Sequence, residues 1–259
     1  MRIGNCALCQ ATNVTLRDSH ILPKCFYRRV RDATAANPNP LHIESGKKVQ
    51  TSKQITQHLL CQDCEQKLAN GCEAYVAREI AYQANGDCPL YKKLGYASTV
   101  TNVALPAPRH AVDCSSLQVQ HLIDFAVSIF WRSAVASVSG TNSFTLPSQV
   151  SDLLRSYLLN HGHELGSIPI TLSVLDQPRG LVANAFHRLF MVPGSHRANG
   201  YRLHGFLLCG LYFTMAEGSA IPPENFQCSL AHAKTPCLAF SVAANLKVLK
   251  NISDLARTT

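Results

Sequence analysis

Two cysteine pairs are the residues in this chain whose spacing most clearly favours a chemistry. Cys6 and Cys9 form one Cys-x2-Cys pair, and Cys61 and Cys64 form a second. A two-residue spacer lets a tight turn aim both sulfurs at one ion, and four thiolates complete the tetrahedral shell that zinc prefers. The pattern therefore predicts a structural zinc site. The alternatives are four unrelated core cysteines, or a redox pair, which neither sequence setting favours.

The elements that must position these cysteines are a turn and a helix. The second pair stands at the start of a predicted helix over residues 61–85, where apolar residues recur with a period of roughly 3.6. Residues 15–22 predict a short strand leading to Pro23, and the Asn-Pro repeats at 36–40 predict a loop. A turn-borne pair followed by a helix-borne pair is the layout of a treble-clef module, which we place at residues 1–88.

A short motif lies between the two cysteine pairs. Residues 18–24 read Asp-Ser-His-Ile-Leu-Pro-Lys, and residues 59–65 read Leu-Leu-Cys-Gln-Asp-Cys-Glu. Together with the first pair, these segments resemble the HNH endonuclease superfamily over residues 1–75. Residues 125–132 look like a segment that accompanies this N-terminus in uncharacterised bacterial and phage-related proteins. The resemblance implies a ββα-metal fold and phosphodiester hydrolysis, in a setting of phage defence or mobile elements.

The resemblance also implies roles for single residues. His20 falls on the general base that activates water, a role that suits an imidazole with a pKa near neutrality. A divalent ion, Mg²⁺ or Mn²⁺, would act beside it and be distinct from the zinc. Ser19 and Thr56 depart from the pattern, because the family usually has a metal ligand and an Asn at these positions. Three carboxylates are candidate substitutes for the missing ligands: Asp18, which shares a strand face with His20, and Glu65 and Glu73 on the predicted helix.

The charge of the chain favours a polyanionic partner. Its formal net charge is +8 and its isoelectric point is near 9.0, which suits nucleic acid, and we expect DNA. A cluster of basic residues in the N-terminal module is the candidate for phosphate contacts: Lys24, Arg28, Arg29, Arg31, Lys47, Lys48 and Lys53. A solvated basic face without a ligand is the alternative reading of the same residues.

The cysteine count and the hydropathy indicate a compartment. The chain lacks an apolar segment long enough to span a membrane, and its first residues lack the apolar region of a secretory signal. We therefore expect a cytoplasmic protein with no membrane partner. In a reducing compartment disulfides are disfavoured, so the seven cysteines outside the two pairs are predicted to be small buried apolar residues.

The rest of the chain, residues 89–259, predicts an α+β domain that selects the target or binds a partner protein. Amphipathic helices are expected at 117–138, with Trp131 in the core and Arg132 at the helix edge, and at 146–159, with Ser148 as a candidate cap. Residues 168–175 alternate like a strand. Residues 185–192 and 201–215 predict a β-hairpin with a longer loop containing 193–195 and 199–200. The histidines at 187, 196 and 204 have no spacing that demands a site.

Three functions are consistent with these patterns. The first is a metal-dependent HNH-type endonuclease. The second is a zinc-stabilised module that binds nucleic acid without cleaving it. The third is a zinc-stabilised protein-interaction module with no nucleic-acid role. The overall fold class is α+β in each case.

Overall fold

A computed structural model of the chain describes residues 2–31, 37–44, 47–83, 88–94, 99–100, 109–136, 144–160, 164–176, 189–233 and 237–242. In this part of the chain, helices combine with two β-sheets, which confirms the α+β class. Within the described residues, no helix combines the length and the apolar character needed to cross a bilayer.

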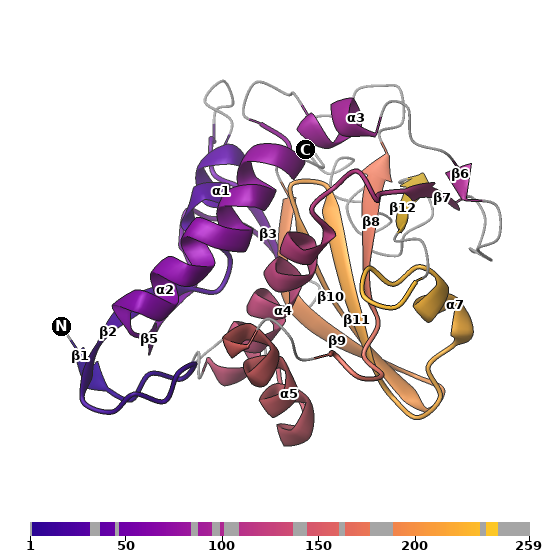
Figure 1. Cartoon of the computed structure of the whole chain (residues 1–259). Helices are drawn as coiled ribbons and strands as arrows, with labels where there is room; N and C mark the ends of the chain where they lie inside the picture. Colours follow the sequence, from indigo (N-terminus) through magenta and orange to yellow (C-terminus); the bar gives the residue numbers. More distant parts are fainter. Residues whose placement is uncertain are drawn as a thin grey trace.

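The smaller sheet carries the N-terminal module. Its strands are antiparallel in the order β1 (Arg2–Gly4), β2 (Val14–His20) and β5 (Thr56–Leu60). The strand predicted at 15–22 is β2, and the short helix α1 (Lys24–Arg29) follows it after Pro23. The helix α2 (Gln62–Leu68) follows β5. This gives the two-strand-and-helix arrangement expected around the cysteine pairs (Figure 1).

The helix predicted over 61–85 is present, but it is not a continuous α-helix. After α2 the chain continues through two π-helical segments, η1 (Ala69–Glu73) and η2 (Val76–Ile80). Gly71 has non-helical backbone angles, with φ −89° and ψ −108°. A π-helical turn has a different residue spacing from an α-helix, so side chains before and after it do not keep one face. A further short helix, α3 (Pro89–Lys93), follows.

The larger sheet draws strands from both halves of the chain. Its order within the described residues is β4-β3-β9-β10-β11-β8-β12-β7-β6. The pairs β3/β9 and β8/β12 are parallel, and the others are antiparallel. The strands span, along the chain, β3 Leu41–Glu44, β4 Lys47–Gln50, β6 Thr99–Val100, β7 Arg109–Asp113, β8 Ile170–Asp176, β9 Leu189–Ala198, β10 Tyr201–Leu208, β11 Leu211–Gly218 and β12 Cys237–Val242.

The hairpin predicted near residue 200 has a shorter loop than expected. Asn199 and Gly200 alone connect β9 to β10, and Gly200 has a φ of +79°, which glycine adopts without strain. Pro193, predicted in the loop, lies inside β9, so that prediction was wrong. The β9–β10 register shifts between Gly205 and Leu207, close to this proline. A bulge of this kind accommodates a residue that has no N–H to donate.

Helix α4 (Val119–Val135) lies between the N-terminal elements and strands β9–β11 (Figure 1). On one side Phe125 contacts Phe26 of α1, with ring centroids 5.6 Å apart. On the other side it contacts Phe213 of β11 at 5.5 Å. Every residue from 122 to 133 is buried, as expected of a helix covered on all sides. One core therefore runs through both halves of the chain. The division into a module at residues 1–88 and a domain at residues 89–259 stays a prediction.

Two shorter features complete the described fold. Helix α5 (Ser148–Leu159) packs on α4 and begins directly after Pro147. It has no side-chain cap, so the predicted capping role of Ser148 was wrong. The short helix α7 (Pro223–Gln227) follows β11.

Candidate metal centre and the histidine beside it

The first cysteine pair lies on a tight turn between β1 and β2. The Gln10 amide donates to the Cys6 carbonyl at 2.9 Å, and Gln10 has a φ of +63°. The Ala7 amide donates to the Leu59 carbonyl at 2.9 Å, which ties this turn to the end of β5. The turn therefore holds Cys6 and Cys9 against the strand that leads to the second pair.

The second pair lies where β5 passes into α2. Cys61 occupies the residue just before the helix, and Cys64 lies in its first turn. The Cys61 amide donates to the Cys6 sulfur at 3.3 Å, a contact between the two pairs. Hydrogen bonds from backbone amides to sulfur favour the thiolate form that a metal ion requires.

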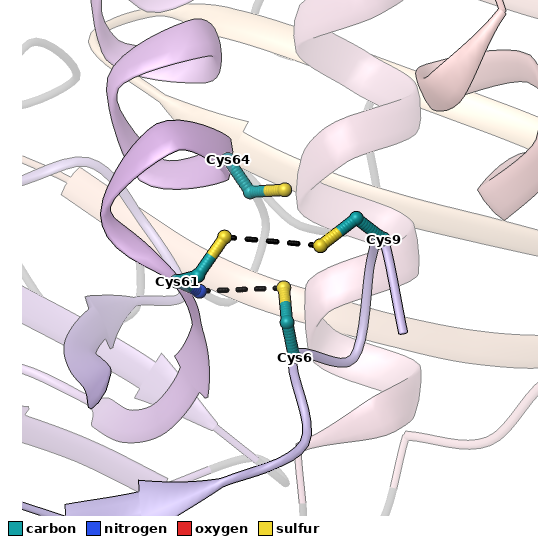
Figure 2. A group of neighbouring side chains, drawn as sticks. All are labelled: Cys6, Cys9, Cys61 and Cys64. Carbon is teal, nitrogen blue, oxygen red and sulfur yellow. Dashed lines mark hydrogen bonds between the residues drawn. The ribbon is translucent and has the colours of Figure 1, made fainter. Parts of the chain in front are cut away.

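The four sulfurs converge on one point. All of them lie within 4.8 Å of one another, and those of Cys9 and Cys61 are 3.8 Å apart. Figure 2 shows the four side chains pointing inward from the turn and from the start of the helix. Zinc–sulfur bonds of about 2.3 Å in a tetrahedron place sulfurs about 3.8 Å apart. The group is therefore able to hold a metal ion, and its donor set is the one that structural zinc prefers.

The electrostatics of the group show the cost of gathering four thiols. Burial raises the pKa of Cys6, but backbone amides of Cys61, Cys9 and Leu8 outweigh it and lower this pKa to about 7. Burial, followed by the nearby thiols of Cys61 and Cys9, raises the pKa of Cys64. Without a cation the group cannot hold four negative charges, and a bound cation deprotonates its cysteine ligands.

His20 ends β2 at the edge of the same module. Its ring is half-buried, and Nε2 lies 2.5 Å from Oε1 of Gln54. An amide oxygen only accepts hydrogen bonds, so Nε2 carries the hydrogen and Nδ1 keeps its lone pair. Sequence reasoning missed Gln54, because no spacing rule links a glutamine in a loop to a histidine on a distant strand.

Ser19 and Glu65 form a second contact next to His20. Ser19 is fully buried, and its hydroxyl donates to Oε2 of Glu65 at 2.8 Å. Side chains alternate along a strand, so Ser19 faces α2 while Asp18 and His20 face away from it. Asp18 is exposed. Glu65 and Asp18 therefore lie on opposite faces of β2.

Glu73 points to a different part of the molecule. Its carboxylate accepts a hydrogen bond from the Arg132 guanidinium of α4 at 2.6 Å, and both side chains are almost completely buried. Arg132 thus lies in the core, and its predicted place at the helix edge was wrong. The π-helical segment at Gly71 explains why Glu65 and Glu73 diverge. The three candidate carboxylates do not assemble, and among the described residues the four cysteines alone form a group that could hold a metal ion.

The predicted basic cluster is only partly available for a ligand. Lys24 and Arg28 are exposed one turn apart on α1. Arg31 is exposed just after this helix, and Lys53 is exposed in the segment before β5. Arg29 instead donates to the Ala77 carbonyl and lies 5.9 Å from the ring centre of Phe26. The strand β4 contains Lys47 and Lys48, whose side chains lie outside the described part.

The other cysteines behave as expected where they are described. Cys25 is half-buried, and the remaining ones are buried thiols outside any disulfide: Cys72, Cys88, Cys114, Cys209 and Cys228. The side chain of Cys237 lies outside the described part, as do His187 and Arg188.

Comparison of the chain with protein families, with curated proteins and with solved structures found no match.

Proposed function

We propose that the chain is an HNH-type endonuclease in which a structural zinc ion on the four cysteines holds the module together and His20 is the general base. The observation that carries this proposal is the position of His20. It is half-buried at the end of β2, its ring is fixed by Gln54, and exposed cations of α1 follow within a few residues. A fixed imidazole beside a basic helix suits attack on a phosphodiester.

The chemistry assigned to this chain's own residues is a proton transfer. With Nε2–H directed at Gln54, Nδ1 of His20 accepts a proton from a water molecule. The resulting hydroxide attacks phosphorus and forms a new P–O bond, while the bond to the leaving sugar oxygen breaks and that oxygen takes a proton from solvent water. Lys24 holds a neighbouring phosphate through its single ammonium charge, and Arg28 holds another through two N–H groups of its guanidinium. The three carboxylates do not converge, so these residues do not form a site for Mg²⁺ or Mn²⁺, and the divalent ion stays a prediction.

Replacing His20 by Ala is expected to lower the rate of cleavage of plasmid or single-stranded DNA by about 10²–10⁴-fold, the usual contribution of a general base. Binding should persist, because the phosphate contacts are assigned to Lys24 and Arg28 of α1. The matched control is His58→Ala, since His58 is exposed on the neighbouring strand opposite Asp18. Parallel reactions with Mg²⁺, Mn²⁺ and EDTA test the divalent ion. If His20→Ala and the control His58→Ala both cleave at the wild-type rate, His20 has no part in the mechanism.

The second candidate is a module that binds nucleic acid without cleaving it. The separation of Asp18, Glu65 and Glu73 favours it, because a phosphodiesterase of this type needs its metal ligands together. It is distinguished by wild-type protein that binds DNA but does not cut it with any of the divalent ions. A protein with neither binding nor cleavage would instead favour the interaction module.

Both candidates require contacts between α1 and phosphates. Replacing Lys24 or Arg28 by Ala should weaken DNA binding for all sequences alike and reduce the slope of log K against log salt by about 0.7–0.9 per residue. Arg29→Ala is not a suitable control, because that side chain packs on Phe26. Arg2→Ala is preferable, since Arg2 is exposed on β1. Fluorescence anisotropy at several salt concentrations measures the slope, and an unchanged slope in both variants would exclude α1.

A further inference from the structure

A row of charged residues crosses the large sheet at the end far from the β10–β11 turn. Arg202 of β10 pairs in register with Arg197 of β9 on one side and with Glu217 of β11 on the other. Directly paired residues on neighbouring strands point to the same face. Two rows further along this face, Phe206 and Phe213 pack under α4. The face that is apolar beneath α4 therefore becomes charged near the Asn199-Gly200 turn.

The charged row lines an open pocket of about 420 Å³. Arg197, Arg202 and Glu217 contribute to its wall together with Tyr201, Gly200, Gly218 and Pro147. Pro147 immediately precedes α5, which has no side-chain cap and no acidic residue in its first turn. The positive end of that helix dipole therefore borders the pocket without a compensating carboxylate of its own.

The two arginines of the row differ in their partners. Arg202 lies 3.7 Å from the Glu217 carboxylate. Arg197 is exposed, and within the described residues no carboxylate pairs with it. Like charges directly opposite on two strands repel each other. With two arginines and one glutamate, the row carries a net positive charge in the pocket.

A buried histidine, His204, lies next to Glu217 on the side away from solvent. His204 is fully buried with its ring edge-on to those of Phe130 and Phe144, and its Nδ1 lies 2.7 Å from the Ser195 hydroxyl. Its Nε2 lies 3.4 Å from Oε1 of Glu217. Burial, and secondarily the Arg202 charge, lower the pKa of His204 to about 4, so the ring is neutral at physiological pH. His204 therefore lies beside the carboxylate without adding to the charge of the pocket, and its Nε2 makes no hydrogen bond there.

We propose that this pocket binds a phosphorylated sugar, as found in a nucleotide, with its phosphate at Arg197 and the start of α5 and a sugar hydroxyl donating to Glu217. A guanidinium fork matches two phosphate oxygens, and helix N-termini favour the same group. The carboxylate supplies the acceptor that a bare phosphate would not need. A volume of this size is within the usual range for small-ligand pockets. The inference is independent of the nuclease proposal, because the lining residues in the described part of the chain all lie outside residues 1–88.

Isothermal titration calorimetry with 5′-AMP, ribose 5-phosphate and adenosine tests the inference on the whole chain. We expect AMP to bind, adenosine not to bind, and Arg197→Ala to weaken AMP binding by about tenfold or more. Arg197 is exposed, so the variant should fold, and an unchanged melting temperature verifies this. Arg2→Ala, which removes a distant exposed charge, should leave the affinity unchanged.

The results with AMP and ribose 5-phosphate show which part of the ligand the pocket recognises, or that it binds no phosphate. Binding of both AMP and ribose 5-phosphate supports recognition of the sugar phosphate alone. Binding of AMP without ribose 5-phosphate supports the same phosphate site with an added contribution from the base. If neither compound binds at millimolar concentration, or if Arg197→Ala and Arg202→Ala both bind AMP like the wild type, the pocket is not a phosphate site.

Discussion

Replacing Cys61 by Ser is expected to abolish stoichiometric metal binding and to destabilise the N-terminal module by several kcal/mol. The four sulfurs converge within 4.8 Å, and removing one leaves three ligands around the ion. In zinc-finger peptides, structural zinc contributes on the order of 10–16 kcal/mol of apparent binding energy at pH 7, and this energy drives folding. Here α1 and α2 also pack on the common core, so we expect a smaller loss than in a free-standing finger.

The measurement is metal content of the purified protein, followed by thermal unfolding with and without a strong chelator. Wild-type protein should contain about one zinc per chain and melt at a lower temperature after chelation. Cys25→Ser is the matched control, because Cys25 is half-buried like Cys61 but does not belong to the sulfur group. Full zinc content and an unchanged melting temperature in Cys61→Ser would show that the four-cysteine site is wrong.

The second large effect is expected from the ion pair between Glu73 and Arg132. Its side chains are 12% and 1% exposed, and the charged atoms are 2.6 Å apart. Removing one partner leaves an uncompensated buried charge, which typically costs about 3–5 kcal/mol. Arg132→Ala should therefore lower the free energy of unfolding by about that amount, with a further contribution from lost packing.

A double-mutant cycle separates the pair from packing. Glu73→Gln and Arg132→Met should each be strongly destabilising, while the double variant should be less destabilised than the sum, because two neutral groups replace two charges. The ion pair of Lys93 and Glu79 is the control, with side chains 37% and 41% exposed at 3.0 Å. Its removal should cost at most about 1 kcal/mol. Similar losses for both pairs in urea denaturation would contradict the buried role of Arg132.

Local patterns could be predicted from the sequence. The cysteine turn depends on residues six positions apart or fewer, and α4 has apolar residues along most of its length. Strand β8 follows from the alternating pattern at 168–175. In each case the signal and the structure lie in the same short segment, so neighbouring residues were sufficient.

Contacts between distant segments could not be predicted in the same way. An uninterrupted α-helix would place Glu73, eight residues after Glu65, near the same helical face, and the π-helical turn at Gly71 breaks that relation. Pro193 looks like a loop residue by type, and only the bulge opposite β10 makes it acceptable in a strand. The pairing of Arg197 with Arg202 depends on a two-residue turn, whereas the composition indicated a longer one.

The pairing between β3 and β9 also constrains the order of folding. Leu41 pairs with Leu189 in a parallel arrangement, so most of the chain separates the two strands. Such long-range pairing is slow, because loop closure must be completed before any contact is gained. During synthesis the cysteine turn and α2 can form early, while β3 waits for residue 189 to leave the ribosome. Until then β3 exposes unpaired backbone groups, and we expect the growing chain to be most prone to association with other copies in this interval.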